Sequence, residues 1–212
     1  MKEPLLIYGT GLIAEVAKYY FENDSPYSVE AFTNHQEFII DDTFCELPVL
    51  DFDDPSLAQK FPNLNLFIAI GHQGQNNIRA KRFDESVSKG FNLVSYISSR
   101  AHVFSQSIGR NAFILENNVI QPFTQIGNNC TLWSGNHIGH HSIVADHSFV
   151  TSHVVVSGNC KIESNCFLGV NATIFDGVTI GRNSIVGAGS IVRKNVAENS
   201  IIRAPLSELK NE

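Results

Sequence analysis

The sequence predicts two domains, a small Rossmann-like α/β domain with a parallel sheet over residues 1–98 and an all-β left-handed parallel β-helix over residues 99–212. Three observations lead to this prediction: strand–helix alternation in the first half, a glycine turn after the first strand, and an unbroken six-residue period in the second half. A chain of 212 residues is long enough to bury a core in each part.

The composition excludes some function classes. The formal net charge is -6, whereas a protein that binds nucleic acid through its phosphates normally carries a basic balance or a basic stripe. There is no apolar run of about 18 residues that would span a membrane, and the apolar stretch near the start is too short for a signal peptide. We therefore expect an intracellular soluble protein with no nucleic-acid partner and no membrane partner.

The elements of the first half follow from the spacing of apolar residues. An apolar stripe at helical spacing predicts a first helix over residues 13–20. Proline-containing residues 34–64 are expected to be mostly loop, with a short strand near Val49. The other expected elements are strands at 5–8, 28–33, 65–70 and 91–97 and a second helix at 78–89.

A glycine turn, Gly9-Thr10-Gly11, separates the first strand from the first helix. Such a turn directs backbone N–H groups and the positive end of the helix dipole toward an anion, typically a phosphate. The fingerprint is incomplete, so a tight structural turn is the alternative interpretation. Gly71 ends another strand at the same edge of the predicted sheet, where such sheets bind ligands, and this favours a nucleotide-type ligand.

The second half repeats with a period of six residues, which fits neither a helix nor a plain strand and predicts short strands joined by corners. Three strands would close one coil of eighteen residues, and about five coils would follow. Small residues two positions before each aliphatic position are expected beside the corners, with Cys130, Cys160 and Cys166 serving as packing atoms. The aliphatic positions are Ile108, Ile114, Ile120, Ile126, Leu132, Ile138, Val144, Val150, Val156, Ile162, Leu168, Ile174, Ile180, Val186 and Val192.

Glycines directly follow several of the aliphatic positions. We expect them where the chain needs an unusual φ angle. They are Gly109, Gly127, Gly139, Gly169, Gly181 and Gly187.

Five of the eight histidines lie within residues 137–153. Because no two of the five are eighteen or thirty-six residues apart, they do not form a column, and we expect no metal site within one chain. His140 stacks on Gly158 one coil later, where no side chain obstructs a ligand. An imidazole that acts as a base, beside an exposed backbone N–H that holds an oxyanion, is a geometry for acyl transfer.

The segment HIGHHSIVADHSFVTSHVVVSGNCKIESNCFLGVNATI, together with the GTG-bearing α/β domain, resembles bacterial sugar acetyltransferases of the sialic acid O-acetyltransferase (NeuD) and PglD-like family. The resemblance extends from Leu5 to about Ala204. It implies a homotrimer in which acetyl-CoA, the co-substrate, lies between adjacent prisms and the first domain holds a nucleotide-linked sugar. No metal is expected.

The resemblance also implies roles for single residues. His140 falls on the position of the catalytic base, and His141 beside it replaces the acidic residue of many members. The cofactor-binding positions fall on Phe149, Gly158, Val170 and Ala188, with Gly158 as the backbone donor to the acetyl oxygen. The substrate-binding positions fall on Gly9, Thr10, Gly11, Asn34 and Gly71.

The leading hypothesis is an acetyl-CoA-dependent N-acetyltransferase that acts on a nucleotide-linked amino sugar in the synthesis of surface glycan precursors. The same scaffold would also suit O-acetylation of a sugar. Two other classes stay open: a non-catalytic protein that binds a nucleotide sugar, and a prism-type carbonic anhydrase with histidines from neighbouring subunits.

Overall fold

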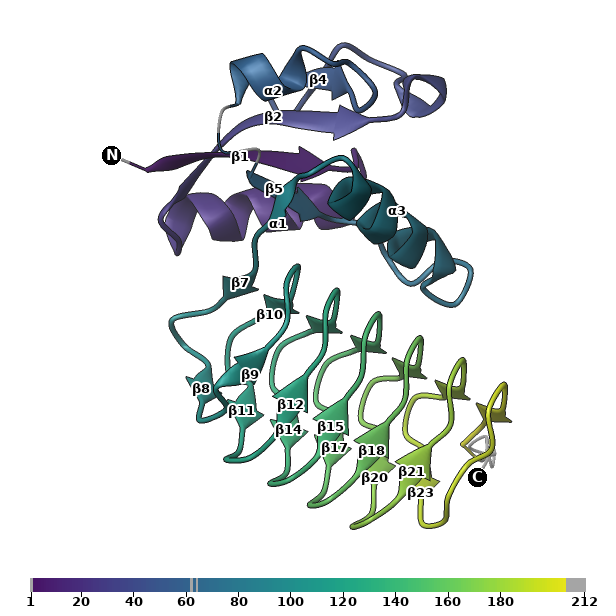
Figure 1. Cartoon of the computed structure of the whole chain (residues 1–212). Coiled ribbons are helices and arrows are strands. Elements are labelled where there is room, and N and C mark those ends of the chain that lie inside the picture. Colours follow the sequence, from purple (N-terminus) through teal and green to yellow (C-terminus); the bar gives the residue numbers. More distant parts are fainter. Residues whose placement is uncertain (1, 62, 64, 205–212) are drawn as a thin grey trace, which may run out of the picture.

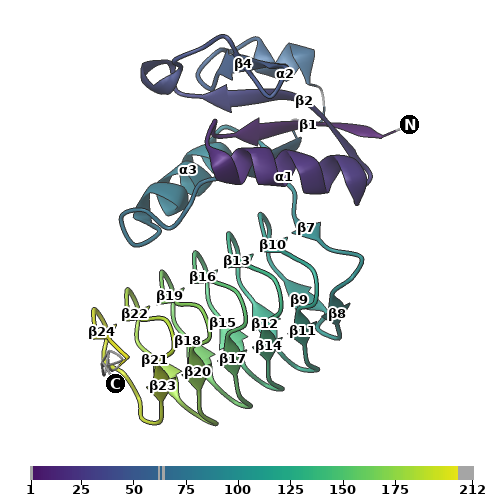
Figure 2. The same ribbon diagram turned by 180° about the vertical axis from the view of Figure 1, so that it is seen from behind.

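The computed structural model describes residues 2–61, 63 and 65–204. Residues 205–212, the end of the predicted second domain, lie outside the described part. The chain forms an α/β domain and a parallel β-helix that lie one above the other, with the long axis of α3 (Asn77–Ser88) extending along the coils (Figures 1 and 2). The β-helix is left-handed, as the sequence predicts.

The α/β domain is built on a six-stranded sheet of order β3-β4-β2-β1-β5-β6. All pairs are parallel except β3–β4. Alternate residues of β1 point to opposite faces: Leu5 and Ile7 pack in the cluster that includes α1, and Leu6 packs with Phe83 of α3. Its elements are β1 (Glu3–Tyr8), α1 (Leu12–Asn23), β2 (Tyr27–Asn34), β5 (Asn65–Ile68), α3 (Asn77–Ser88) and β6 (Asn92–Leu93).

The expected short strand near Val49 is confirmed as β4 (Leu47–Asp51), but the rest of residues 34–64 holds more regular structure than the expected loop. The segment adds a second parallel partner to β2, because Val49 and Leu50 pair with Phe32 and Thr33. The prolines do not prevent this, since Pro48 lies on the strand that pairs with short β3 near the edge of the sheet. The elements are η1 (Gln36–Phe38), β3 (Thr43–Phe44), β4 (Leu47–Asp51) and α2 (Leu57–Lys60).

The β-helix has three faces, each a parallel sheet of two-residue strands. The first face holds β7 (Tyr96–Ile97), β10 (Phe113–Ile114), β13 (Thr131–Leu132), β16 (Phe149–Val150), β19 (Phe167–Leu168), β22 (Ile185–Val186) and β24 (Ile201–Ile202). The second holds β8 (His102–Val103), β11 (Val119–Ile120), β14 (His137–Ile138), β17 (Val155–Val156), β20 (Thr173–Ile174) and β23 (Ile191–Val192). The third holds β9 (Ser107–Ile108), β12 (Gln125–Ile126), β15 (Ile143–Val144), β18 (Lys161–Ile162) and β21 (Thr179–Ile180).

Residues eighteen apart pair from coil to coil, as the period predicts: Phe113, Thr131 and Phe149 lie in one register. We call the turns from first to second face, second to third face, and third to first face the first, second and third corners. The coils extend further than predicted. The expected strand over 91–97 is two strands, of which β6 joins the α/β sheet and β7 already pairs with β10 of the β-helix.

The predicted interior of the β-helix is confirmed. Its inward aliphatic residues and the apolar small residues two positions before them form one cluster, with Leu132, Ile138 and Val144 fully inaccessible to solvent, and the polar small residues at the equivalent positions are buried as well. Burial raises the pKa of the Cys130 thiol to about 12 and that of Cys166 to about 11, so both stay protonated. These cysteines are packing atoms, as expected.

The prediction about glycine φ angles is wrong for the glycines that follow the aliphatic positions. Their backbone is ordinary, and they are required because the next coil is close: a Cβ at Gly109 would lie 2.6 Å from the nitrogen of Asn128. The left-handed conformation occurs two residues later, at Asn111 and at each sixth residue through Gly189. Asparagine, histidine and glycine occupy all but one of these described positions; Phe123 is the exception.

The third corner carries the α/β domain. Asn111 Oδ1 accepts a hydrogen bond from the backbone N–H of Ile68 at the end of β5 (2.7 Å). Arg79 of α3 is 1% exposed, and its guanidinium donates to the carbonyl oxygens of Asn129 and His147 (2.5 and 3.0 Å). Burial lowers the pKa of Arg79 to about 10, so it is still charged at neutral pH.

We predict that Arg79→Ala lowers the free energy of unfolding by about 3 kcal/mol, because buried carbonyl oxygens lose their donor and the space is left empty. Denaturant unfolding followed by circular dichroism measures the change. Arg182→Ala, at a side chain 65% exposed in a 3.8 Å ion pair with Glu198, is the control and should shift stability by about 0.5 kcal/mol or less. Equal effects of the two changes would contradict a central role for Arg79.

We also predict a pH dependence from His147, which accepts a hydrogen bond from Asn129 Nδ2 (2.9 Å). Burial lowers the pKa of His147 below 6.5, with Arg79 adding to the effect and Asp146 and Asp84 opposing it. The unfolded chain therefore binds more protons just below pH 6.5, and the stability from this group, complete above that pH, is lost as the pH falls. His147→Asn keeps a residue suited to the left-handed corner. Its free energy of unfolding should fall less than that of the wild type between about pH 7.5 and about pH 5.5; an equal fall would contradict the prediction.

Candidate functional site

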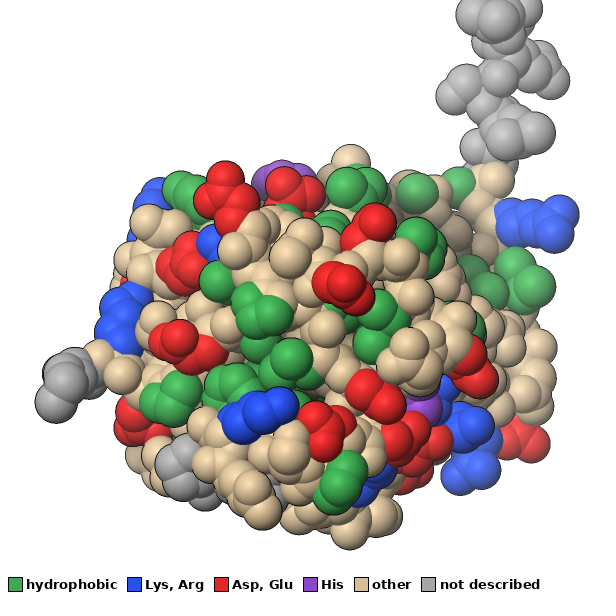
Figure 3. All heavy atoms as spheres, turned by 90° about the horizontal axis from the view of Figure 1, so that it is seen from above, with side chains coloured by type: hydrophobic (Ala, Val, Ile, Leu, Met, Phe, Trp, Pro, Cys, Tyr) green, Lys and Arg blue, Asp and Glu red, His purple; other side chains and the backbone are tan. Residues whose placement is uncertain are grey.

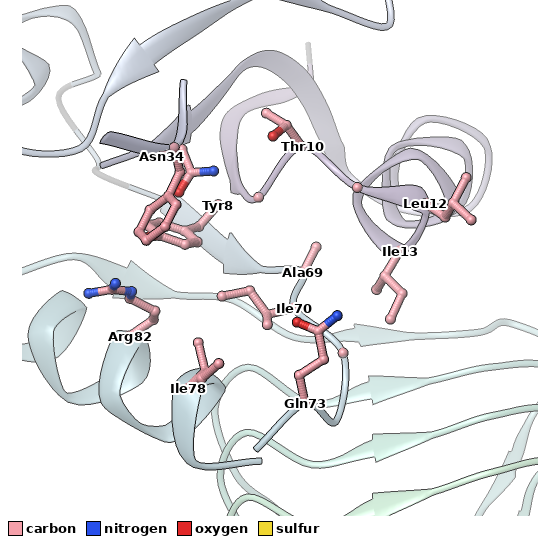
Figure 4. A pocket seen from close by; sticks show the side chains of 14 residues that line it. Tyr8, Thr10, Leu12, Ile13, Asn34, Ala69, Ile70, Gln73, Ile78 and Arg82 are labelled. Carbon is pink, nitrogen blue, oxygen red and sulfur yellow. The ribbon is translucent and has the colours of Figure 1, made fainter. Parts of the chain in front are cut away.

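A pocket of about 600 Å³ opens at the carboxyl ends of β1 and β5, beside the start of α1 (Figure 4). It brings together all five predicted substrate positions, Gly9, Thr10, Gly11, Asn34 and Gly71. Parallel topology explains this, because the strands that precede these residues all end at one edge of the sheet.

The glycine turn shapes the pocket and leaves donors at its wall. Gly9 has φ +116°, and a Cβ there would lie 3.0 Å from the carbonyl oxygen of Ala69 on the neighbouring strand. The first bonds within α1 run from the N–H groups of Ala14 and Glu15 to Gly11 O, so the N–H groups before them at the pocket are not used by the helix. The N-terminus of a twelve-residue helix with free N–H groups favours an anion.

Arg82 is the one charged side chain among the described residues that line the pocket. It extends from α3 toward the pocket on the same side as Asn34, and Thr10 lies on the other side (Figure 4). Glu85 accepts a hydrogen bond from Arg82 (2.6 Å), and His35 Nε2 lies 3.3 Å from the same nitrogen. These contacts fix the orientation of the guanidinium.

Sequence reasoning missed several lining residues: Tyr8, Leu12, Ile13, Phe38, Ala69, Ile70, Gln73, Ile78 and Arg82. A signal existed for two of them. Ile78 and Arg82 are four residues apart on the helix that follows β5, so they lie on one helical face directed at the same sheet edge. Burial raises the pKa of the Tyr8 hydroxyl, which lies 2.7 Å from His35 Nδ1, to about 12.

The predicted base lies at the second corner, and its contact with Gly158 is confirmed. A Cβ at Gly158 would meet His140 Cε1 at 2.7 Å and Nε2 at 2.8 Å, so only glycine leaves room for the ring. His140 and His141 are both exposed, and their Nδ1 atoms are 3.2 Å apart. His141 also fills a left-handed corner position, with φ +59°.

The expectation of an exposed backbone N–H at Gly158 is wrong in this structure. That N–H donates to Asp176 Oδ1 (2.8 Å), a residue one coil further along the same corner. The side chain satisfies the donor that an oxyanion would need. Gly158 makes room for the His140 ring here, and its role as a donor stays a prediction.

The other predicted cofactor positions do not gather around His140. Val170 and Ala188 are eighteen residues apart and exposed at the first corner, whereas His140 is at the second. The Phe149 ring is 3% exposed and its centroid lies 5.3 Å from that of His72, so it is not at the surface of the single chain, and its role as a cofactor position stays a prediction. Docking of the α/β domain covers it.

Among the described residues, charged side chains and side chains that could bind a metal ion are dispersed. No group of three or more His, Cys, Asp or Glu side chains there could hold a metal ion. The described helices include none that is long and apolar enough to cross a membrane. On the face in Figure 3, acidic side chains are interspersed with basic and apolar ones.

Two segments match family models. Residues 107–139 match the bacterial transferase hexapeptide (six repeats), and residues 160–194 match the hexapeptide repeat of succinyl-transferase. Both matched segments lie in the β-helix, and both models describe hexapeptide repeats of transferases. No curated protein matches the chain significantly by sequence.

Solved structures resemble the whole chain, the hexapeptide-repeat domain included. PerB from Caulobacter crescentus, in complex with CoA and GDP-perosamine, is 25% identical with a TM-score of 0.82 and covers 93% of this chain and 92% of its own. The acetyltransferase domain of PglB from Neisseria gonorrhoeae, in complex with acetyl coenzyme A, is 17% identical (TM-score 0.81; 95% and 96% covered). WeeI from Acinetobacter baumannii is 19% identical (TM-score 0.66; 95% and 97% covered). The last two likenesses establish the fold.

Proposed function

We propose that the chain transfers an acetyl group from acetyl-CoA to the amine of a nucleotide-linked amino sugar. The observation that carries this proposal is the pocket at the Gly9–Gly11 turn, in a chain that matches PerB with its CoA and GDP-perosamine over 93% of its length. The two alternative functions, O-acetylation and binding without chemistry, become outcomes of the experiments below.

The pocket supports recognition of a nucleoside diphosphate. Backbone N–H groups at the start of α1 and the guanidinium of Arg82 would bind the diphosphate, because both favour negative charge. Asn34 and Phe38 line the same pocket and supply a polar and an aromatic surface for the base or ribose. Gly71 keeps the wall open, since a Cβ there would lie 3.2 Å from Ile13 Cδ1.

His140 would act as the general base, with His141 beside it. The amine nitrogen forms a bond to the acetyl carbonyl carbon, the carbon–sulfur bond breaks, and CoA leaves as a thiolate. His140 Nε2 accepts the proton that the amine loses, and the thiolate is protonated in turn. Gly158 carries no side chain that would cover this nitrogen.

A homotrimer would complete the site. The second corner holds His140 and Gly158, while the first corner presents Val170 (43% exposed) and Ala188, so one chain does not place all of them around one acetyl-CoA. Packing of neighbouring β-helices would bring a second corner to a first corner. Exposed Ile191 on the second face, at 60%, is an apolar residue for that contact.

We propose synthesis of polysaccharide precursors in the cytoplasm as the setting in which this enzyme acts.

We predict that Arg82→Ala weakens the binding of GDP or UDP about tenfold or more, because a charge-assisted hydrogen bond to phosphate is lost. Isothermal titration calorimetry at low salt measures the change. Lys81→Ala removes the same charge from the adjacent residue of α3, a side chain 69% exposed, and should leave affinity within about twofold. Equal losses in both variants would mean that only net charge matters and that Arg82 does not contact the phosphates.

We predict that a thiol-release assay with acetyl-CoA and a panel of UDP-, dTDP- and GDP-linked amino sugars detects turnover, and that His140→Ala lowers kcat about 100-fold or more. His102→Ala, at an exposed histidine of β8, is the matched control and should keep wild-type turnover. Turnover that survives in His140→Ala would assign the base elsewhere.

Two further results separate the alternatives. Binding of acetyl-CoA without turnover of any amino sugar, but with turnover of a hydroxyl-bearing sugar nucleotide, would favour O-acetylation. Binding of a sugar nucleotide without any binding of acetyl-CoA would contradict the transferase and favour a non-catalytic binding protein.

A further inference from the structure

One corner of the β-helix departs from the rule that the others follow. Phe123 has φ +65°, whereas every other left-handed corner residue described in the β-helix is asparagine, histidine or glycine. A bulky aromatic residue is disfavoured in this conformation, because its Cβ approaches the backbone and it lacks the short polar side chain that compensates. Phe123 is also 72% exposed, so burial of the ring does not offset the strain. Strain that packing does not explain is characteristic of functional positions.

The corner segment Gln121–Phe123 contacts both histidines of the candidate site. The backbone N–H of His140 donates to Gln121 Oε1 (2.8 Å), and the N–H of His141 donates to the carbonyl oxygen of Pro122 (3.3 Å). The Phe123 ring packs on the His141 ring, with centroids 4.8 Å apart and planes inclined by 34°. Three consecutive residues of one coil thus contact two consecutive residues of the next.

The contact between the two imidazoles decides which nitrogen is free to act. A neutral imidazole carries one hydrogen, so His140 can accept a proton at Nε2 only if its Nδ1 bears that hydrogen. The Nδ1 atoms of His140 and His141 are 3.2 Å apart. If His141 Nδ1 is unprotonated, it accepts this hydrogen and holds His140 in the required tautomer, and the orientation of the His141 ring decides whether its Nδ1 points there.

We propose that Gln121–Phe123 is a positioning platform, in which the Phe123 ring holds His141 so that His141 Nδ1 accepts the Nδ1–H of His140 and leaves His140 Nε2 free beside Gly158. Phe123 and His141 are positioning residues that act through His140. The importance of this arrangement for turnover rests on the proposed function, whereas the arrangement itself is a property of the folded chain. It accounts for the one strained aromatic corner in the described coils.

Phe123→Asn gives opposite expectations for stability and activity. Asparagine suits the left-handed corner, so the variant should unfold at a temperature about 2–4 °C higher. Because His141 loses its aromatic support, kcat should fall about tenfold, while the KM values for acetyl-CoA and the amino sugar stay within about twofold. Phe123→Tyr keeps the aromatic ring, and its kcat should stay at the wild-type value. Phe104→Asn, the same class of change at another exposed aromatic residue (61%), is the control.

A spectroscopic measurement tests the platform without activity. Nitrogen-15 NMR of histidine-labelled protein at about pH 8, where imidazoles are neutral, reports the tautomer of each ring, and His140→Ala identifies the signal of His140. The proposal expects the Nδ1–H tautomer of His140 in the wild type and a mixture of tautomers in Phe123→Asn.

The outcomes separate the two proposals. A fixed Nδ1–H tautomer that Phe123→Asn disturbs supports the platform even if no sugar reacts, and in that case only the proposed function fails. Unchanged His140 signals in Phe123→Asn overturn the platform, whatever the activity. A wild type in which His140 is already a mixture, or carries its hydrogen at Nε2, overturns it as well.

Discussion

The left-handed residue at each corner of the β-helix is the constraint on which the rest of the structure depends. A coil of eighteen residues closes only if the chain turns sharply after every strand, and each turn from Asn111 through Gly189 uses one residue with positive φ. This requirement selects asparagine, glycine and histidine at one position in six. Their polar side chains then lie in columns, because residues eighteen apart are stacked.

One of these columns places the α/β domain. At the third corner Asn111 donates to Asn129, and Asn129 donates to His147, so the corner side chains form a ladder of hydrogen bonds. Asn111 also accepts a hydrogen bond from the backbone N–H of Ile68 at the end of β5, and Arg79 of α3 donates to the carbonyl oxygen of Asn129. The same strand end and the same helix line the pocket, so the geometry of the ligand site is tied to the backbone of the coils.

Periodicity and topology account for what could be predicted from the sequence. The six-residue period indicated the buried columns, and parallel strand order placed Gly9, Asn34 and Gly71 at one edge before any contact was known. The first coil was missed because Val103 and Ile108 are five residues apart, which breaks the register. The burial of Phe149 depends on how the two domains meet, and the local pattern carries no information on that.

His141 illustrates how one residue can satisfy a structural and a chemical demand together. Histidine at a left-handed corner is not itself a functional signal: His147 occupies the same kind of position and belongs to the docking ladder, and His153 packs over Gly135. What distinguishes His141 is its surroundings, with a second imidazole 3.2 Å away and an aromatic ring beneath it. The backbone alone would accept asparagine or glycine at this corner, so the choice of histidine is explained by the neighbouring imidazole. The strained phenylalanine one coil earlier follows from the same demand, since a ring that accepts a hydrogen bond in one direction must be held in one orientation.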